Sequence, residues 1–119
     1  MKTTFYCKLP LREIVKIIKN IYGNSIFDEY AAGNSVETIM LGHYYIRISR
    51  WVVFFIVLHE ENEKTIIHIS IGINSVKKTI SPELLFTPRI TLGNIITDIG
   101  VTYDFFKPFA EEIVDYVEF

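Results

Sequence analysis

The 119-residue chain has little of several features that define common classes of protein. Its single cysteine, Cys7, excludes an intrachain disulfide and therefore a small extracellular scaffold held together by disulfides. Twelve Lys and Arg residues against fourteen Asp and Glu residues give a net charge of −2, so the chain lacks the basic excess that general nucleic-acid binding requires. Its longest apolar run, Trp51 to Leu58, is far shorter than the roughly 20 residues of a membrane-spanning helix.

Sequence motifs of common catalytic centres are also missing. The chain contains no glycine-rich phosphate loop, no G-x-S-x-G, no H-E-x-x-H and no C-x-x-C. Cys7 is a candidate nucleophile, but a lone cysteine in a β-rich sequence more often acts as a small buried hydrophobe. We therefore expect a protein that is not an enzyme and that carries no cofactor and no metal.

Hydrophobic residues, in contrast, make up 50% of the chain and aromatic residues 14%. This composition offers enough apolar surface to offset the entropy cost of folding, so we expect residues 1–119 to form a single domain. The mean hydropathy of +0.27 is high for so small a chain, which suggests that some apolar surface is hidden against a partner, a second copy or a ligand. The first eight residues lack the apolar core of a secretory signal, so we expect a cytoplasmic protein.

Hydrophobic periodicity predicts an α+β fold, with an antiparallel β-sheet and an N-terminal and a C-terminal helix packed on one face. The expected order is β-α-β-β-β-β-α. Residues 74–103, which are interrupted by Pro82, Pro88 and Gly93, give no consistent pattern. The expected elements are a strand at 3–9, a helix at 10–22, strands at 26–30, 36–49 (one strand or two), 51–59 and 65–73, and a helix from about 104 onward.

Two prolines guide the placement of the helices. Pro10 stands at the start of the first helix, where its missing N–H costs nothing, and Gly23 follows the end of that helix. We place the start of the last helix near Asp104, a plausible N-cap, because Pro108 then falls in the first turn.

The clearest pattern is a hairpin formed by residues 51–59 and 65–73. A tight turn at 61–64 pairs positions whose numbers sum to 125, and this odd sum places four alternate isoleucines of the second arm on one face with apolar residues of the first. We expect the helices to cover this face. It contains Val52, Phe54, Ile56 and Leu58 opposite Ile67, Ile69, Ile71 and Ile73.

The opposite face of the same hairpin is aromatic and partly polar, and it is our candidate functional surface. Three interpretations fit it: an interface between copies of the chain, a pocket for an apolar small molecule, or a core closed by residues 74–103. The first makes the protein a homo-oligomer, and none of them involves nucleic acid or a membrane. The candidate residues are Trp51, Val53, Phe55, His59, His68 and Ser70.

An alternative function is a small metal-binding protein or enzyme that uses His59 and His68. The predicted register makes these histidines diagonal neighbours, with Cα atoms about 7–8 Å apart. A zinc site needs a third and usually a fourth ligand. Nothing in the spacing selects among the further candidates, although Glu60 is expected to face the other way; they are Cys7, Glu37, His43 and Glu60.

Charged residues suggest two further possibilities. We expect Tyr45, Arg47 and His43 on one strand face. There Arg47 either binds an anion or, more commonly, forms a structural ion pair. The helix at 10–22 carries three basic residues, whereas residues 98–119 hold six acids and one lysine. These segments of opposite charge could attract each other within one chain or between chains.

Overall fold

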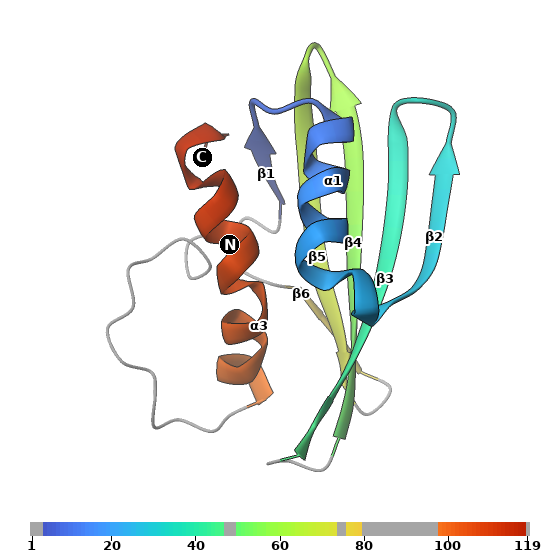
Figure 1. Cartoon of the computed structure of the whole chain (residues 1–119), viewed down its shortest axis with the longest axis vertical. Coiled ribbons are helices and arrows are strands. Elements are labelled where there is room, and N and C mark those ends of the chain that lie inside the picture. The colour runs from blue at the N-terminus through green and yellow to red at the C-terminus, as the bar shows by residue number, and fades with distance from the viewer. Residues whose placement is uncertain (1–3, 47–49, 74–75, 80–97, 119) are drawn as a thin grey trace.

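A computed structural model describes residues 4–46, 50–73, 76–79 and 98–118. These residues form one antiparallel sheet with two α-helices on the same side of it (Figure 1). The predicted α+β class, the element order and the position of the helices are confirmed. Neither helix in the described ranges is long and apolar enough to cross a membrane.

The sheet has seven strands in the order β2-β3-β4-β5-β1-β7, and β6 pairs with β5 beyond the end of β1. Both β6 and β7 were missed in the sequence, because strands of four and two residues are too short to show periodicity. Two 3₁₀ turns, Gly23–Ser25 and Val114–Tyr116, follow the helices. The elements are β1 Thr4–Cys7, α1 Leu11–Tyr22, β2 Ile26–Ala32, β3 Val36–Tyr45, β4 Arg50–Glu61, β5 Lys64–Ile73, β6 Val76–Thr79, α3 Asp98–Ile113 and β7 Val117–Glu118.

The predicted register of the β4–β5 hairpin is confirmed. Ile56 lies opposite Ile69, and all paired residue numbers sum to 125. The turn has two central residues, Asn62 and Glu63, with φ values of 53° and 64°. Positive φ at both positions is typical of the type I′ turn, whose twist matches that of the two strands.

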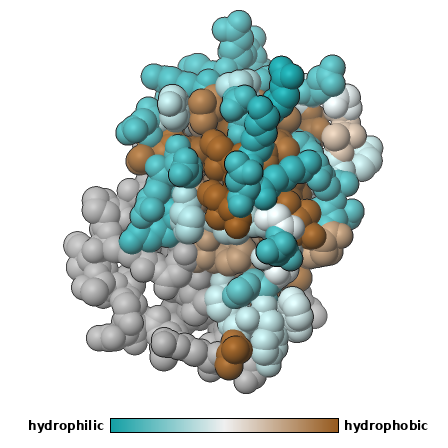
Figure 2. All heavy atoms as spheres, in the orientation of Figure 1, coloured by the Kyte–Doolittle hydropathy of each residue, from teal (hydrophilic) through white to brown (hydrophobic). Residues whose placement is uncertain are grey.

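The hydrophobic core lies between the helices and one face of the sheet. On that face β4 and β5 contribute alternate residues that are almost fully buried, as their alternating sequence predicts. Figure 2 views the molecule from the helix side and shows hydrophilic side chains over α1, with hydrophobic residues visible between them. The buried residues of α1 follow helical spacing and are Leu11, Ile14, Val15, Ile18 and Tyr22.

The last helix begins earlier than predicted. It starts at Asp98 rather than near Asp104, so Asp104 is not an N-cap and Pro108 lies inside the helix. An interior proline costs about 3 kcal/mol because it removes one backbone hydrogen bond. Burial of Phe106 and Phe109 on either side of it contributes more than enough apolar stabilisation to offset this loss. The predicted start of the helix was wrong because it was chosen to keep Pro108 in the first turn and took no account of the packing of Phe106 and Phe109.

Candidate functional site on the outer face of the sheet

The outer face is the surface of the sheet that is turned away from α1 and α3. All six candidate residues belong to it, because each of them alternates along its strand with residues that are buried on the helix side. Trp51 is 67% exposed and His59 is also exposed, whereas Val53, Phe55 and His68 are half-buried. Ser70 is only 1% exposed and so is not accessible on this surface.

Other strands bring further aromatic side chains to the outer face, and these side chains were not predicted from the sequence. Tyr30 is 66% exposed and Phe27 is 58% exposed, both from β2, while β1 and β3 each supply a tyrosine. The β4–β5 hairpin could be registered from the sequence because it combines a two-residue turn with clear alternation in β5, whereas β2 and β3 show no such alternation. We call the exposed apolar members of this face the aromatic patch; they are Tyr6, Phe27, Tyr30, Tyr44, Trp51 and Val57.

The middle of the aromatic patch is organised around Gly42 in β3. A Cβ atom added to Gly42 would lie 3.4 Å from the ring of Phe27 and 3.8 Å from that of Trp51. Because glycine has no side chain, these two rings approach each other over the strand. Tyr44 lies opposite Trp51 in the register, with ring centroids 5.6 Å apart. Three strands therefore contribute to one continuous aromatic surface.

Charged side chains of the outer face lie at its margins. At one corner the carboxylate of Glu118 in β7 accepts a hydrogen bond from Lys64 Nζ at 2.8 Å and lies 3.8 Å from Lys8 Nζ. These lysines lower the pKa of Glu118. The central strands β3 and β4, in contrast, present no Asp, Glu, Lys or Arg to the outer face between Val36 and Tyr44 or between Trp51 and His59.

The interpretation in which residues 74–103 close this face concerns a segment that lies largely outside the described residues. Arg47 also lies outside the described residues. His43 and Tyr45, which were expected on the same strand face as Arg47, lie on the helix side with ring centroids 4.6 Å apart. That side is opposite to the aromatic patch, so the His43 and Tyr45 run does not extend the candidate site.

The two predicted metal ligands share a face, but their candidate partners do not. His59 lies opposite Ile66 and His68 lies opposite Val57, which makes the histidines diagonal neighbours on the outer face, as predicted. The four further candidates are on the helix side of the sheet: Cys7, Glu37, His43 and Glu60. In the described ranges no group of three or more His, Cys, Asp or Glu side chains has a metal-binding arrangement.

Cys7 is fully buried in the core. Burial raises the pKa of its thiol, which favours the protonated, unreactive form. The surroundings therefore fit the interpretation of Cys7 as a small hydrophobic residue and give no support to a nucleophile.

Two cavities lie near the start of α1, with volumes of about 490 and 510 Å³, and no residue of the aromatic patch lines either of them. The outer face itself is formed by several adjacent strands. Among known proteins, neither a family model nor a curated sequence matches the chain.

Proposed function

We propose that the protein is a non-catalytic module that self-associates in the cytoplasm, with the outer face of one copy packed against the outer face of another. The observation that carries this proposal is the aromatic patch on the side of the sheet opposite the helices. Exposing contiguous apolar surface of this kind to water is unfavourable by about 25 cal/mol per Å². Association of two such faces removes that cost from both copies.

The size of the outer face agrees with this proposal. Its five adjacent strands, from β2 to β1, are 4 to 12 residues long. At about 3.3 Å per residue and 4.8 Å between strands, the face covers roughly 700 Å². A standard protein interface buries about 600–1,000 Å² on each partner, so the area of one face falls within the range of stable dimers.

The chemistry of the face favours a second copy of the chain over a partner with a charged surface. Its two central strands present no Asp, Glu, Lys or Arg between Val36 and Tyr44 or between Trp51 and His59, several aromatic side chains are exposed on it, and a two-fold axis would place the same apolar surface on both sides of the interface. The charges at its corner already pair within the chain, between Glu118 and the two lysines. Face-to-face packing of two sheets about 10 Å apart is a common architecture for such surfaces.

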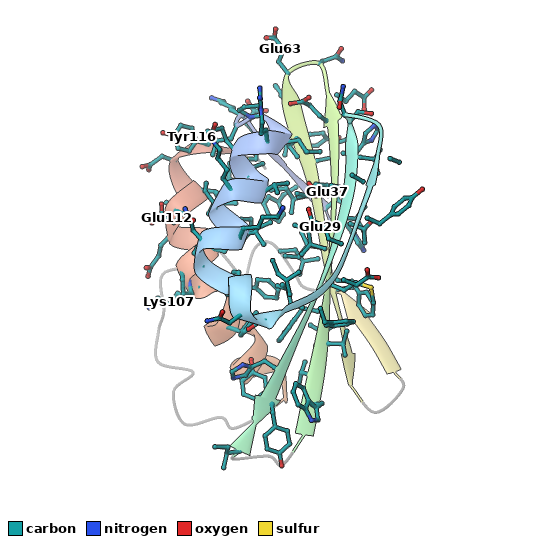
Figure 3. All side chains as sticks on the ribbon, turned by 45° about the vertical axis from the view of Figure 1, so that its right-hand side comes forward. Glu29, Glu37, Glu63, Lys107, Glu112 and Tyr116 are labelled. Carbon is teal, nitrogen blue, oxygen red and sulfur yellow. The ribbon has the colours of Figure 1, made fainter. Side chains whose placement is uncertain are left out.

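The proposal is tested by replacing Trp51, whose side chain is exposed in the single chain. Sedimentation velocity of the wild-type chain across the micromolar range is expected to show a concentration-dependent dimer. Trp51→Ser should raise the dissociation constant of the dimer about thirtyfold, as expected for an exposed tryptophan that becomes buried in an interface. A variant at Tyr116 is the matched control, since this exposed tyrosine lies on the helix side (Figure 3).

The control variant Tyr116→Ser should dimerise as the wild type does. A wild-type chain that stays monomeric throughout the range contradicts self-association, and so does a Trp51→Ser variant that dimerises as tightly as the wild type. A monomer that binds an apolar fluorescent probe through Trp51 would instead establish the apolar-ligand interpretation.

A further inference from the structure

Two glutamates and a lysine form a charged cluster on the inner side of the β2–β3 ribbon. Glu29 in β2 and Glu37 in β3 are diagonal neighbours in the register, so their long side chains can meet. Their carboxyl groups lie within hydrogen-bonding reach of each other, and Lys19 Nζ of α1 lies 2.9 Å from Glu29 Oε1. Figure 3 shows both glutamates in the space between α1 and β2.

Burial distinguishes the two carboxyl groups. Glu37 is 7% exposed, whereas the side chain of Glu29 is 32% exposed and close to the lysine. A hydrogen bond between two carboxyl groups requires that one of them hold a proton. Burial, together with the hydrogen bond and charge of Glu29, raises the pKa of Glu37 to about 7. The hydrogen bond from Glu37 and the contact with Lys19 lower the pKa of Glu29.

In the described part of the chain, strand β2 meets the helix layer through Ile26 at its start, which packs against the core, and through this cluster. It is the edge of the sheet, and every residue from Phe27 to Ala32 is exposed. A cavity of about 490 Å³ separates the first turns of α1 from the β2–β3 hairpin, with Arg12 and Glu60 at its margin and Glu37 in its lining. Water that enters this cavity can exchange the proton of Glu37 while the chain stays folded.

We propose that the Glu29–Glu37 carboxyl pair is a pH-sensitive switch that holds the edge strand β2 against the helix layer when one proton is shared and releases it when that proton is lost. With the proton present, the cluster has one negative charge opposite Lys19. Without the proton, two carboxylates face each other beside a single lysine. The other charged groups that line the cavity, Arg12 and Glu60, have opposite signs. The switch does not depend on the proposed self-association.

The direction of the pH dependence follows from Glu37. Its pKa is raised in the folded chain, so the stabilisation it gives is complete below the ordinary glutamate value of about 4.3 and is lost as the pH rises toward about 7. Glu29 acts in the opposite sense, because its lowered pKa makes its contribution disappear in acid. The strand should therefore be held best in mildly acidic solution and should open more often at neutral pH.

Hydrogen exchange of the β2 amides, expressed as protection factors that correct for intrinsic exchange, tests the switch. Between about pH 5 and pH 7 the protection of wild-type β2 should fall about fivefold or more. In Glu37→Gln the side-chain amide donates permanently to the Glu29 carboxylate, so this fall should vanish. The matched control is Glu13→Gln, because Glu13 also pairs with a lysine of α1, Lys16, at 3.7 Å but is exposed.

The Glu13→Gln variant should keep the wild-type pH dependence, and loss of that dependence in the control counts against the switch. In the wild-type chain, the side-chain carboxyl carbon of Glu37 should titrate near pH 7 by NMR. Titration near the ordinary value of about 4.3 would overturn the proposal whether or not any variant folds. Equal pH dependence in Glu37→Gln and the wild type would overturn it as well.

Discussion

Phe54 and Phe55 are neighbours in β4 but lie in different environments. Phe54 is fully buried on the helix side, with its ring stacked on Phe105 at a centroid distance of 4.3 Å and edge-on to Phe106 at 5.0 Å. Phe55 is half-buried on the outer face opposite Ser70. Successive side chains of a strand point to opposite faces, so one step in sequence moves a ring from the core to the candidate interface.

This difference predicts unequal losses of stability. Phe54→Ala should lower the free energy of unfolding by about 3–5 kcal/mol, because it leaves a cavity among aromatic rings that do not collapse into it. Phe55→Ala, the matched control, should cost the monomer about 1 kcal/mol. Urea unfolding of both variants, at concentrations below dimerisation, measures the two values. Losses of similar size would show that Phe54 and Phe55 do not lie on opposite faces of the sheet.

At the scale of elements, the start of α1 is stabilised from outside the helix. Pro10 occupies the N-cap position and has no side-chain group to accept a hydrogen bond from the first turn. Glu60, near the end of β4, supplies that group: its Oε1 accepts a hydrogen bond from Leu11 N at 3.0 Å. A carboxylate at this position also interacts favourably with the positive end of the helix dipole.

We expect Glu60→Ala to destabilise the chain by about 1–2 kcal/mol, because Leu11 N–H loses its acceptor and the helix start loses a negative charge. Urea unfolding measures the loss. Glu61→Ala is the matched control, since Glu61 is the exposed neighbour in the same strand, and it should stay within about 0.5 kcal/mol of the wild type. A loss as large in the control would show that charge alone, and not the contact with Leu11, is responsible.

The elements also show which parts of the structure the sequence could predict. The β4–β5 register was predictable because a two-residue turn leaves one pairing that puts Ile67, Ile69 and Ile71 on the same face as Phe54, Ile56 and Leu58. The full β2–β3 pairing was not, because the extra residue Phe27 shifts the register between Ile26 and Asp28 and alternation does not locate such a bulge. The Glu29–Glu37 contact lies on the turn side of the bulge, where the pairing is regular, and it was hidden because neither strand alternates between apolar and polar residues.

At the scale of the whole molecule, the described ion pairs lie on the helix side or at a margin of the outer face. Lys8 after β1, Lys64 in β5 and the lysines of α1 form ion pairs within the chain, among them Lys16 with Glu13 and Lys19 with Glu29. Exposed pairs of this kind contribute little to stability, typically 1 kcal/mol or less each. They nevertheless leave few charges available for an attraction between the basic helix of one chain and the acidic C-terminal segment of another.

The two routes to association, apolar and charged, respond differently to salt. Raising the ionic strength from about 0.1 M to about 1 M shortens the Debye length from about 10 Å to about 3 Å and screens exposed charges. Packing of uncharged outer faces should keep or slightly lower the dissociation constant over this range, whereas attraction between charged segments should raise it about tenfold or more. Sedimentation velocity at both salt concentrations measures the change, with Trp51→Ser as the reference that lacks the apolar contact. A dimer that dissociates in high salt would contradict association through the aromatic patch, because the centre of that patch carries no Asp, Glu, Lys or Arg to be screened.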